Sequence, residues 1–267
     1  MRLARPWFLF RFRALPEGIL TKKRTEDSIR LFLETKHIES FSDALDAASP
    51  RPVEGAAQAE KKNYAERFSK ALSVLIANRL RPTFPSIMPL PDGTRQESRA
   101  PTGKGKKKLD VNYSTHELGL ALGVSIKTLN FRDAASRRYT KNATRIDNEL
   151  RAEASDYHER QPYVVMAGIV FVPIDSCDDG KNGRSSFAQI VEVLRHRANR
   201  LTPRDRDELF ERIYIGLYDF VASPASVIFF DVAQLAPPAG RPGGSVSLDF
   251  ETMVHQIVAL YKNRNRS

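Results

Sequence analysis

The sequence predicts an α/β fold, with a mixed central β-sheet of about four to six strands flanked by helices. Segments with strand-like and helix-like patterns alternate over residues 61–267. Two apolar runs, at 163–172 and 227–232, are nearly continuous, which is typical of strands buried on both faces of a sheet. With 267 residues and 41% hydrophobic content, the chain can bury a sizeable core.

Residues 1–60 are predicted to form an N-terminal region of strand, helix and linker. Large apolar residues alternate with arginine at 7–12, which predicts an edge strand, and residues 25–35 predict a helix with Thr25 as N-cap. Turn-forming residues at 49–58 predict the linker.

The α/β domain is predicted to span residues 61–267. It begins with a helix at 61–80, whose apolar residues recur every three to four positions. Five prolines and the run GKGKKK then predict a mobile Pro/Lys-rich loop at 81–108. After the middle of the chain, helical patterns follow at 185–199, 203–221 and 249–262.

A β-hairpin is predicted in the middle of the chain. Apolar residues occupy every second position from Leu120 to Ile126, so they form one face of a strand and Lys127 points to the other face. If the chain reverses at 116–119, antiparallel pairing sets Asp110 opposite residues near Lys127. Such a pair could hold a divalent metal and stabilise a developing oxyanion, as phosphodiester hydrolysis requires.

A helix predicted at 142–160 offers further charged groups. Arg145, Glu149 and Glu153 recur every four residues, so two carboxylates and a guanidinium lie on one side of it. This side could be a solvated face with an Arg145–Glu149 ion pair. Because the helix directly follows the strand that carries Lys127, the same side could instead return to the open end of the hairpin.

The order of these residues resembles the PD-(D/E)XK, or restriction-endonuclease-like, nuclease superfamily. In that family, an Asp that begins one strand and a short (D/E)-x-K motif on the next strand assemble a magnesium site. Asp110 matches the first Asp and Lys127 matches the Lys, whereas Ser125 stands where the second acid is usual. Some restriction endonucleases show a similar S-x-K and draw the missing acid from the following helix. The resemblance covers roughly residues 105–175.

The resemblance implies a restriction-endonuclease-like core and a Mg²⁺-dependent DNA endonuclease, in which Mn²⁺ can substitute. Glu149 is the expected relocated acid, with Glu153 as its rival and Glu66, on the preceding helix, as a further candidate. Asp110, Glu149 and the carbonyl of Ile126 would hold the metal.

The other expected roles follow from the same resemblance. Ser125 would bridge where the family has an acid, and Lys127 would orient the attacking water. Five residues after the hairpin are expected to position DNA phosphates, namely Arg137, Arg138, Lys141, Asn142 and Arg145.

Composition bears on partners and location. The chain has 42 Lys and Arg against 32 Asp and Glu, a net charge of +10, which attracts polyanions in a salt-dependent way. The single cysteine, Cys177, excludes an intramolecular disulfide and suits a reducing cytoplasm. No segment reaches the ~18 to 20 apolar residues of a membrane span, so we expect no membrane association.

The resemblance also implies a biological setting. Nucleases of this superfamily are often restriction enzymes or effectors of anti-phage defence, so we expect double-stranded DNA as substrate. A partner protein of a defence system and a homodimer are the candidate assemblies. The alternative is a DNA-binding or scaffolding subunit of a defence complex, in which Ser125 marks a degenerate nuclease site.

Overall fold

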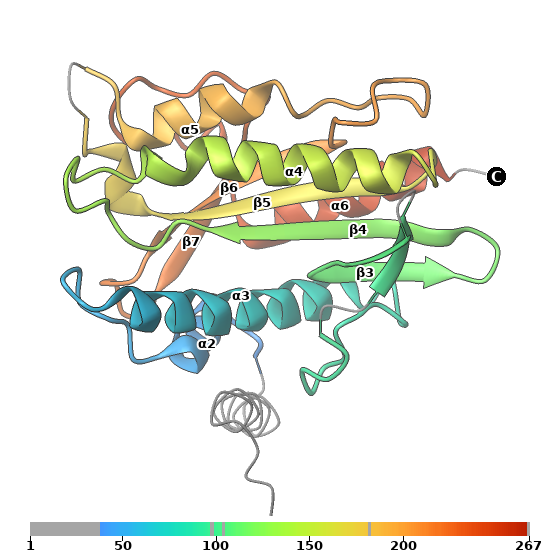
Figure 1. The fold of residues 1–267 in the computed structure, drawn as a ribbon, viewed down its shortest axis with the longest axis horizontal. Coiled ribbons are helices and arrows are strands. Elements are labelled where there is room, and N and C mark those ends of the chain that lie inside the picture. Colours follow the sequence, from blue (N-terminus) through green and yellow to red (C-terminus); the bar gives the residue numbers. More distant parts are fainter. Residues whose placement is uncertain (1–37, 97–98, 103–104, 181–182, 266–267) are drawn as a thin grey trace, which may run out of the picture.

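A six-stranded mixed sheet with helices on both faces forms the centre of the structure, as Figure 1 shows. The structure is a computed structural model that describes residues 38–96, 99–102, 105–180 and 183–265. The strand predicted at 7–12 and the helix predicted at 25–35 lie outside the described residues. The predicted class, a mixed sheet flanked by helices, is confirmed.

The strands lie side by side in the order β3-β4-β5-β6-β7-β8. β4 is parallel to β5 and β5 to β6, whereas the other neighbours are antiparallel. The carboxyl ends of β4, β5 and β6 therefore meet at one end of the sheet, where open α/β sheets place their ligands. The strands are β3 (Val111–Thr115), β4 (Gly119–Thr128), β5 (Val165–Pro173), β6 (Arg212–Asp219), β7 (Ser226–Asp231) and β8 (Ser247–Leu248).

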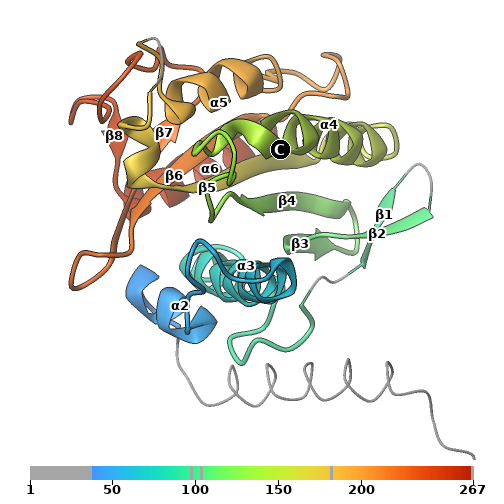
Figure 2. The ribbon, with the colours of Figure 1, turned by 60° about the vertical axis from the view of Figure 1, so that its left-hand side comes forward.

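Helices cover the sheet in two layers, with α2 and α3 below it and α4 and α5 above it in Figure 2. α6 packs in the same hydrophobic cluster as α2 and α3. Within the described part of the chain, no helix is long and apolar enough to cross a bilayer. The helices are α2 (Phe41–Ala48), α3 (Gln58–Leu80), α4 (Ala143–His158), α5 (Ser186–Arg195) and α6 (Phe250–Arg264), with short 3-10 helices η1 (Thr140–Asn142) and η2 (Ile174–Cys177).

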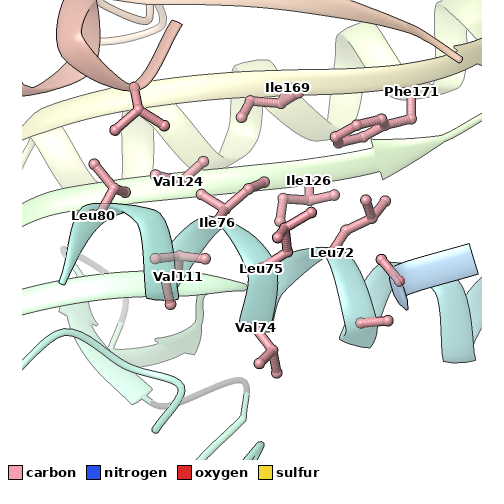
Figure 3. Packing of buried hydrophobic residues seen from close by; sticks show 14 of the residues in the cluster. Leu72, Val74, Leu75, Ile76, Leu80, Val111, Val124, Ile126, Ile169 and Phe171 are labelled. Carbon is pink, nitrogen blue, oxygen red and sulfur yellow. The ribbon is translucent and has the colours of Figure 1, made fainter. Parts of the chain in front are cut away.

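The core between α3 and the sheet fixes the hairpin that carries the candidate site. Leu72 and Ile76 of α3 point toward Val124 and Ile126 of β4 (Figure 3), and all four side chains are buried. Full burial of one such side chain stabilises the fold by roughly 1.5–3 kcal/mol. Because Val124 and Ile126 are held on this face, Ser125 and Lys127 must project from the opposite face, toward α4.

A β-bulge in the hairpin changes one predicted position. The pairing shifts from Tyr113↔Leu122 to Ser114↔Leu120, so Ala121 is an extra residue. Leu122 packs with α3, whereas Leu120 packs with α4 residues on the other face of the sheet. The prediction that both leucines share one face is therefore wrong.

The segment 203–221, predicted as a helix, contains strand β6 instead. Apolar residues recur at helical spacing from Leu209 to Leu217, which suggested the helix. However, every residue from Ile213 to Tyr218 is buried, as in a strand covered on both faces. The β-branched and aromatic side chains of this run favour a strand.

The Pro/Lys-rich segment 81–108, predicted as a loop, contains two short strands. It ends in a small antiparallel sheet of β1 (Arg99–Thr102) and β2 (Gly105–Lys108). A proline in a strand is tolerated at an edge, and each strand of a two-stranded sheet has a free edge. β1 contacts β4 and α4, so this hairpin lies beside the candidate site.

Replacement of Gly216 by Ala is expected to destabilise the fold by roughly 1–3 kcal/mol, as overpacking does. Gly216 lies inside β6, and a Cβ atom there would come 2.8 Å from Cδ1 of Phe171 and 3.3 Å from Phe229. Urea unfolding would measure the loss. Gly243→Ala is the matched control, since a Cβ atom at Gly243 would have no neighbour within 4 Å; equal stability of the two variants would contradict the prediction.

Candidate active site

Asp110 and Lys127 meet at one end of the β3–β4 hairpin. The chain reverses between Thr115 and Gly119, as predicted, and the ladder pairs Val111 with Val124. Asp110 lies one position beyond this pair, and its Oδ2 accepts a hydrogen bond from the backbone N–H of Ile126 at 2.7 Å. The carboxylate is thereby fixed against the end of β4, next to Lys127.

Glu153 of α4 completes the group. The Ser125 hydroxyl donates to Glu153 Oε2 at 2.5 Å, and Lys127 Nζ donates to Glu153 Oε1 at 2.6 Å. Ser125 and Lys127 are two residues apart on a strand, so both project toward α4 and one carboxylate can reach both. The predicted return of the acidic helix face to the hairpin is therefore present in the structure.

Glu149 lies one helical turn before Glu153 and is farther from the lysine. Its Oε2 is 3.7 Å from Lys127 Nζ, and its Oε1 accepts a hydrogen bond from Arg145 at 2.5 Å. Of the two helix acids, Glu153 rather than the expected Glu149 makes the closest contacts with Lys127.

Asp110, Lys127 and Glu153 line a small pocket of about 150 Å³. The N–H and C=O groups of one strand residue point to the same side, so the carbonyl of Ile126 faces the edge where its N–H meets Asp110. The pocket is lined by Lys108, Leu109, Asp110, Ile126, Lys127 and Glu153.

Lys127 is held in its charged form. Burial lowers the pKa of Lys127, but the carboxylates of Glu153, Asp110 and Glu149 together outweigh this effect and leave the pKa raised. Lys127 therefore carries a positive charge at neutral pH and can stabilise negative charge, whereas it is poorly suited to accept a proton.

Tyr157 of α4 lies near the two carboxylates of the site, whose charges act on its hydroxyl. It is fully buried one turn after Glu153, and its hydroxyl has no hydrogen-bond partner among the described residues. Burial, and then the charges of Glu153 and Asp110, raise the pKa of Tyr157, so the phenol stays protonated.

The oxygen atoms of the pocket fit a hard divalent cation. Within the described residues, no group of three or more His, Cys, Asp and Glu side chains is placed to hold a metal together. Mg²⁺, however, is commonly bound by one or two carboxylates and completes its shell with water and substrate phosphate. Asp110 and Glu153, with the carbonyl of Ile126, offer such a set.

The structure does not bring Glu66 to this site. Glu66 lies on α3, on the opposite face of the sheet from α4, and pairs with Lys70 at 3.1 Å. The sequence could not exclude Glu66, because helix order alone does not tell which face of the sheet a helix covers.

The predicted phosphate-binding residues gather near a second, larger cavity of about 440 Å³, which we call the α3–α4 cleft. Arg138, Lys141, Asn142 and Arg145 line it, whereas Arg137 instead pairs with Glu54 at 2.9 Å. The cleft lies at the carboxyl end of β4, between the first turns of α3 and α4. It is lined by Gln58, Lys61, Lys62, Ala65, Thr128, Leu129, Asn130, Phe131, Arg132, Asp133, Ala134, Arg138, Tyr139, Lys141, Asn142 and Arg145.

Three basic residues of the cleft were not predicted, namely Lys61, Lys62 and Arg132. The lysines begin α3, far in sequence from the hairpin, and only the fold brings them to α4. The acid of the cleft, Asp133, organises its loop: hydrogen bonds from Lys141 and Ser136 lower the pKa of Asp133 to about 2, so it stays ionised.

Two carboxylates, an ammonium group and a hydroxyl thus converge at the hairpin end, beside a basic cleft. Their arrangement can bind a cation and stabilise negative charge on a phosphate. Comparison of the chain with protein-family models, with curated proteins and with solved structures finds no match in any of the three.

Proposed function

We propose that this protein is a Mg²⁺-dependent deoxyribonuclease with a restriction-endonuclease-like core. One observation carries the proposal: the Glu153 carboxylate, supplied by the helix after β4, contacts both Ser125 and Lys127 next to Asp110. This is the arrangement expected of a nuclease site of the PD-(D/E)XK type in which the second acid has moved from the strand to the helix.

Each residue has a role that follows from its contacts. Ser125 holds the Glu153 carboxylate at the strand position where the family has its own acid. Lys127, charged at neutral pH, orients the attacking water and offsets the charge that develops on the phosphorane. Asp110 and Glu153, with the Ile126 carbonyl, would hold Mg²⁺, which lowers the pKa of a bound water.

DNA is the proposed substrate. The net charge of +10 attracts a polyanion, and the basic lining of the α3–α4 cleft adjoins the pocket through consecutive residues of β4, Lys127 and Thr128. A role as a cytoplasmic restriction enzyme or anti-phage effector, acting with a partner protein or as a homodimer, follows from the resemblance to restriction endonucleases.

The proposal is tested by incubating the purified protein with supercoiled plasmid and with phage DNA. We expect nicking or linearisation with Mg²⁺ or Mn²⁺ and none with EDTA, since the site needs a divalent cation. Cleavage that continues at the same rate in EDTA would contradict the proposed mechanism.

The absence of an acid at Ser125 favours a second candidate, a DNA-binding subunit with a degenerate nuclease site. This candidate predicts salt-sensitive DNA binding without cleavage under any metal condition. The same plasmid experiment, combined with a binding assay, separates the two.

A further inference from the structure

The α3–α4 cleft is strongly basic. Six of its lining side chains are cationic and one is acidic: Lys61, Lys62, Arg132, Arg138, Lys141 and Arg145 against Asp133. Lys61 and Lys62 come from α3 and Arg145 from α4, on opposite faces of the sheet, so a ligand in the cleft would be held from both sides. The other three cations come from the segment between β4 and α4. Such a lining selects an anion. The cavity, of about 440 Å³, has room for an anion larger than a single phosphate group.

The aromatic rings of the cleft already have cationic partners. The guanidinium of Arg51 lies 4.8 Å from the ring centroid of Phe131, and Lys61 Nζ lies 5.4 Å from it. Arg132 lies 5.6 Å from the ring centroid of Tyr139, which is buried. A nucleobase that stacked on either ring would displace these contacts, so the cleft is suited to phosphate rather than to base recognition.

One residue links the cleft to the active site. Arg145 lines the cleft and holds Glu149 at 2.5 Å, and Glu149 is in turn 3.7 Å from Lys127 in the catalytic pocket. Arg145 is exposed and can turn to an anion in the cleft. A phosphate that binds Arg145 competes directly with Glu149 for the same guanidinium.

We infer that the α3–α4 cleft binds a backbone phosphate of the substrate strand between Lys62 and Arg145, and that this binding releases Glu149 to join Asp110 and Glu153. The inference deepens the proposed function and rests on it for the role of the metal. Before substrate binds, Arg145 holds the Glu149 carboxylate away from the pocket that Asp110 and Glu153 line. After binding, the pocket gains a carboxylate and holds a divalent cation more tightly.

The phosphate contact is tested by DNA binding in EDTA, measured by fluorescence anisotropy over a range of salt concentrations. Lys62→Ala should weaken binding of a short duplex and reduce the slope of log K against log [salt] by about 0.9, the value for one lost phosphate contact. The loss should be the same for duplexes of different sequence, because phosphates carry no sequence information.

Lys262→Ala is the charge-matched control, since Lys262 is exposed on α6, far from the α3–α4 cleft. Its neighbour Arg264 contacts Glu211, which lies at the end of the sheet opposite the cleft. An equal loss in this control, or an unchanged slope in Lys62→Ala, would refute the phosphate site. Base-dependent binding of a free mononucleotide in the cleft, lost in Lys62→Ala, would also refute it and indicate a nucleotide effector instead.

The release of Glu149 is tested by Mn²⁺ binding, followed by electron paramagnetic resonance with a duplex that carries a non-hydrolysable backbone. In the wild-type protein we expect the duplex to increase Mn²⁺ affinity by roughly 10-fold or more, as ligand changes at metal sites do. The Asp110→Asn variant lacks a proposed metal ligand, so its Mn²⁺ binding with the same duplex measures the Mn²⁺ that the DNA itself binds. Glu149→Gln should abolish the increase, and Arg145→Ala should show the tighter affinity without any duplex.

The outcomes separate the inference from the proposed function. If no variant binds Mn²⁺ but Lys62→Ala lowers the salt slope, the nuclease proposal fails and the phosphate site stands. If the wild-type protein binds Mn²⁺ and cuts DNA, yet Glu149→Gln keeps the full duplex effect, the nuclease proposal stands and the release of Glu149 is wrong.

Discussion

Replacement of Lys127 by Met is expected to lower the rate of DNA cleavage by about 10²–10³-fold, the range for loss of one group that stabilises charge in the transition state. Methionine keeps much of the length of the side chain but removes the charge next to Glu153. DNA affinity should change little, because Lys127 is only 17% exposed and the cleft cations remain. Plasmid cleavage and duplex binding, measured on the same preparation, check both parts.

Lys70→Met is the matched control for this substitution. Lys70 is 18% exposed and pairs with a glutamate at 3.1 Å, much as Lys127 does, but it lies on the opposite face of the sheet. The Lys70→Met protein should therefore cut DNA at the wild-type rate. A Lys127→Met protein that is folded by circular dichroism and cuts as fast as Lys70→Met would remove Lys127 from the mechanism.

The same assay ranks the two helix acids. Glu153→Gln should be as impaired as Lys127→Met, because Glu153 contacts both Ser125 and Lys127. Glu149→Gln should lose about 10–100-fold, as expected of a residue that supports the site from farther away. The reverse order would make Glu149 the principal acid.

Replacement of Glu211 by Gln is expected to destabilise the protein by roughly 3–5 kcal/mol, since it leaves buried charges without their partner. Glu211 is 2% exposed and lies between two arginines, with Arg264 NH1 at 3.0 Å and Arg200 NH1 at 3.4 Å. Its carboxylate also accepts a hydrogen bond from the N–H of Met166 at 2.7 Å, which ties the start of β5 to the start of β6.

Urea unfolding and calorimetry would measure this loss, which corresponds to a fall in Tm of roughly 6–20 °C for a domain of this size. Glu192→Gln is the control, because Glu192 pairs with Arg184 at the surface, where an ion pair contributes at most about 1 kcal/mol. If Glu211→Gln is as stable as the control, the arginines must find other partners and the buried cluster does not hold the two strands together.

The hairpin and its two charged residues could be predicted from the sequence because they depend on local order. The alternation that ends at Ile126 fixes the face of Lys127, and a reversal before Gly119 fixes its distance from Asp110. The choice between Glu149 and Glu153 could not be predicted. Both lie on one face of α4, and only the height at which the helix docks on β4 decides which one meets Lys127.

The remaining differences arise where several structures satisfy the same pattern. The apolar spacing of 209–217 fits a helix face, but burial on both sides of β6 makes every position apolar and hides the strand period. The α3–α4 cleft depends on contacts between residues such as Lys62 and Arg145, which are far apart in the chain. No local pattern predicts that the first turns of two helices on opposite faces of a sheet will meet at its end.

The edges of the sheet determine how copies of this chain can associate. Among the described residues, the sheet ends on one side at β8, a strand of two residues. On the other side, Met88 exchanges both backbone hydrogen bonds with Asn112 of β3. Short or covered edges give a second chain little backbone to pair with. A dimer of this protein is therefore expected to form through helices or loops, and its sheet should resist the edge-to-edge stacking with which aggregation begins.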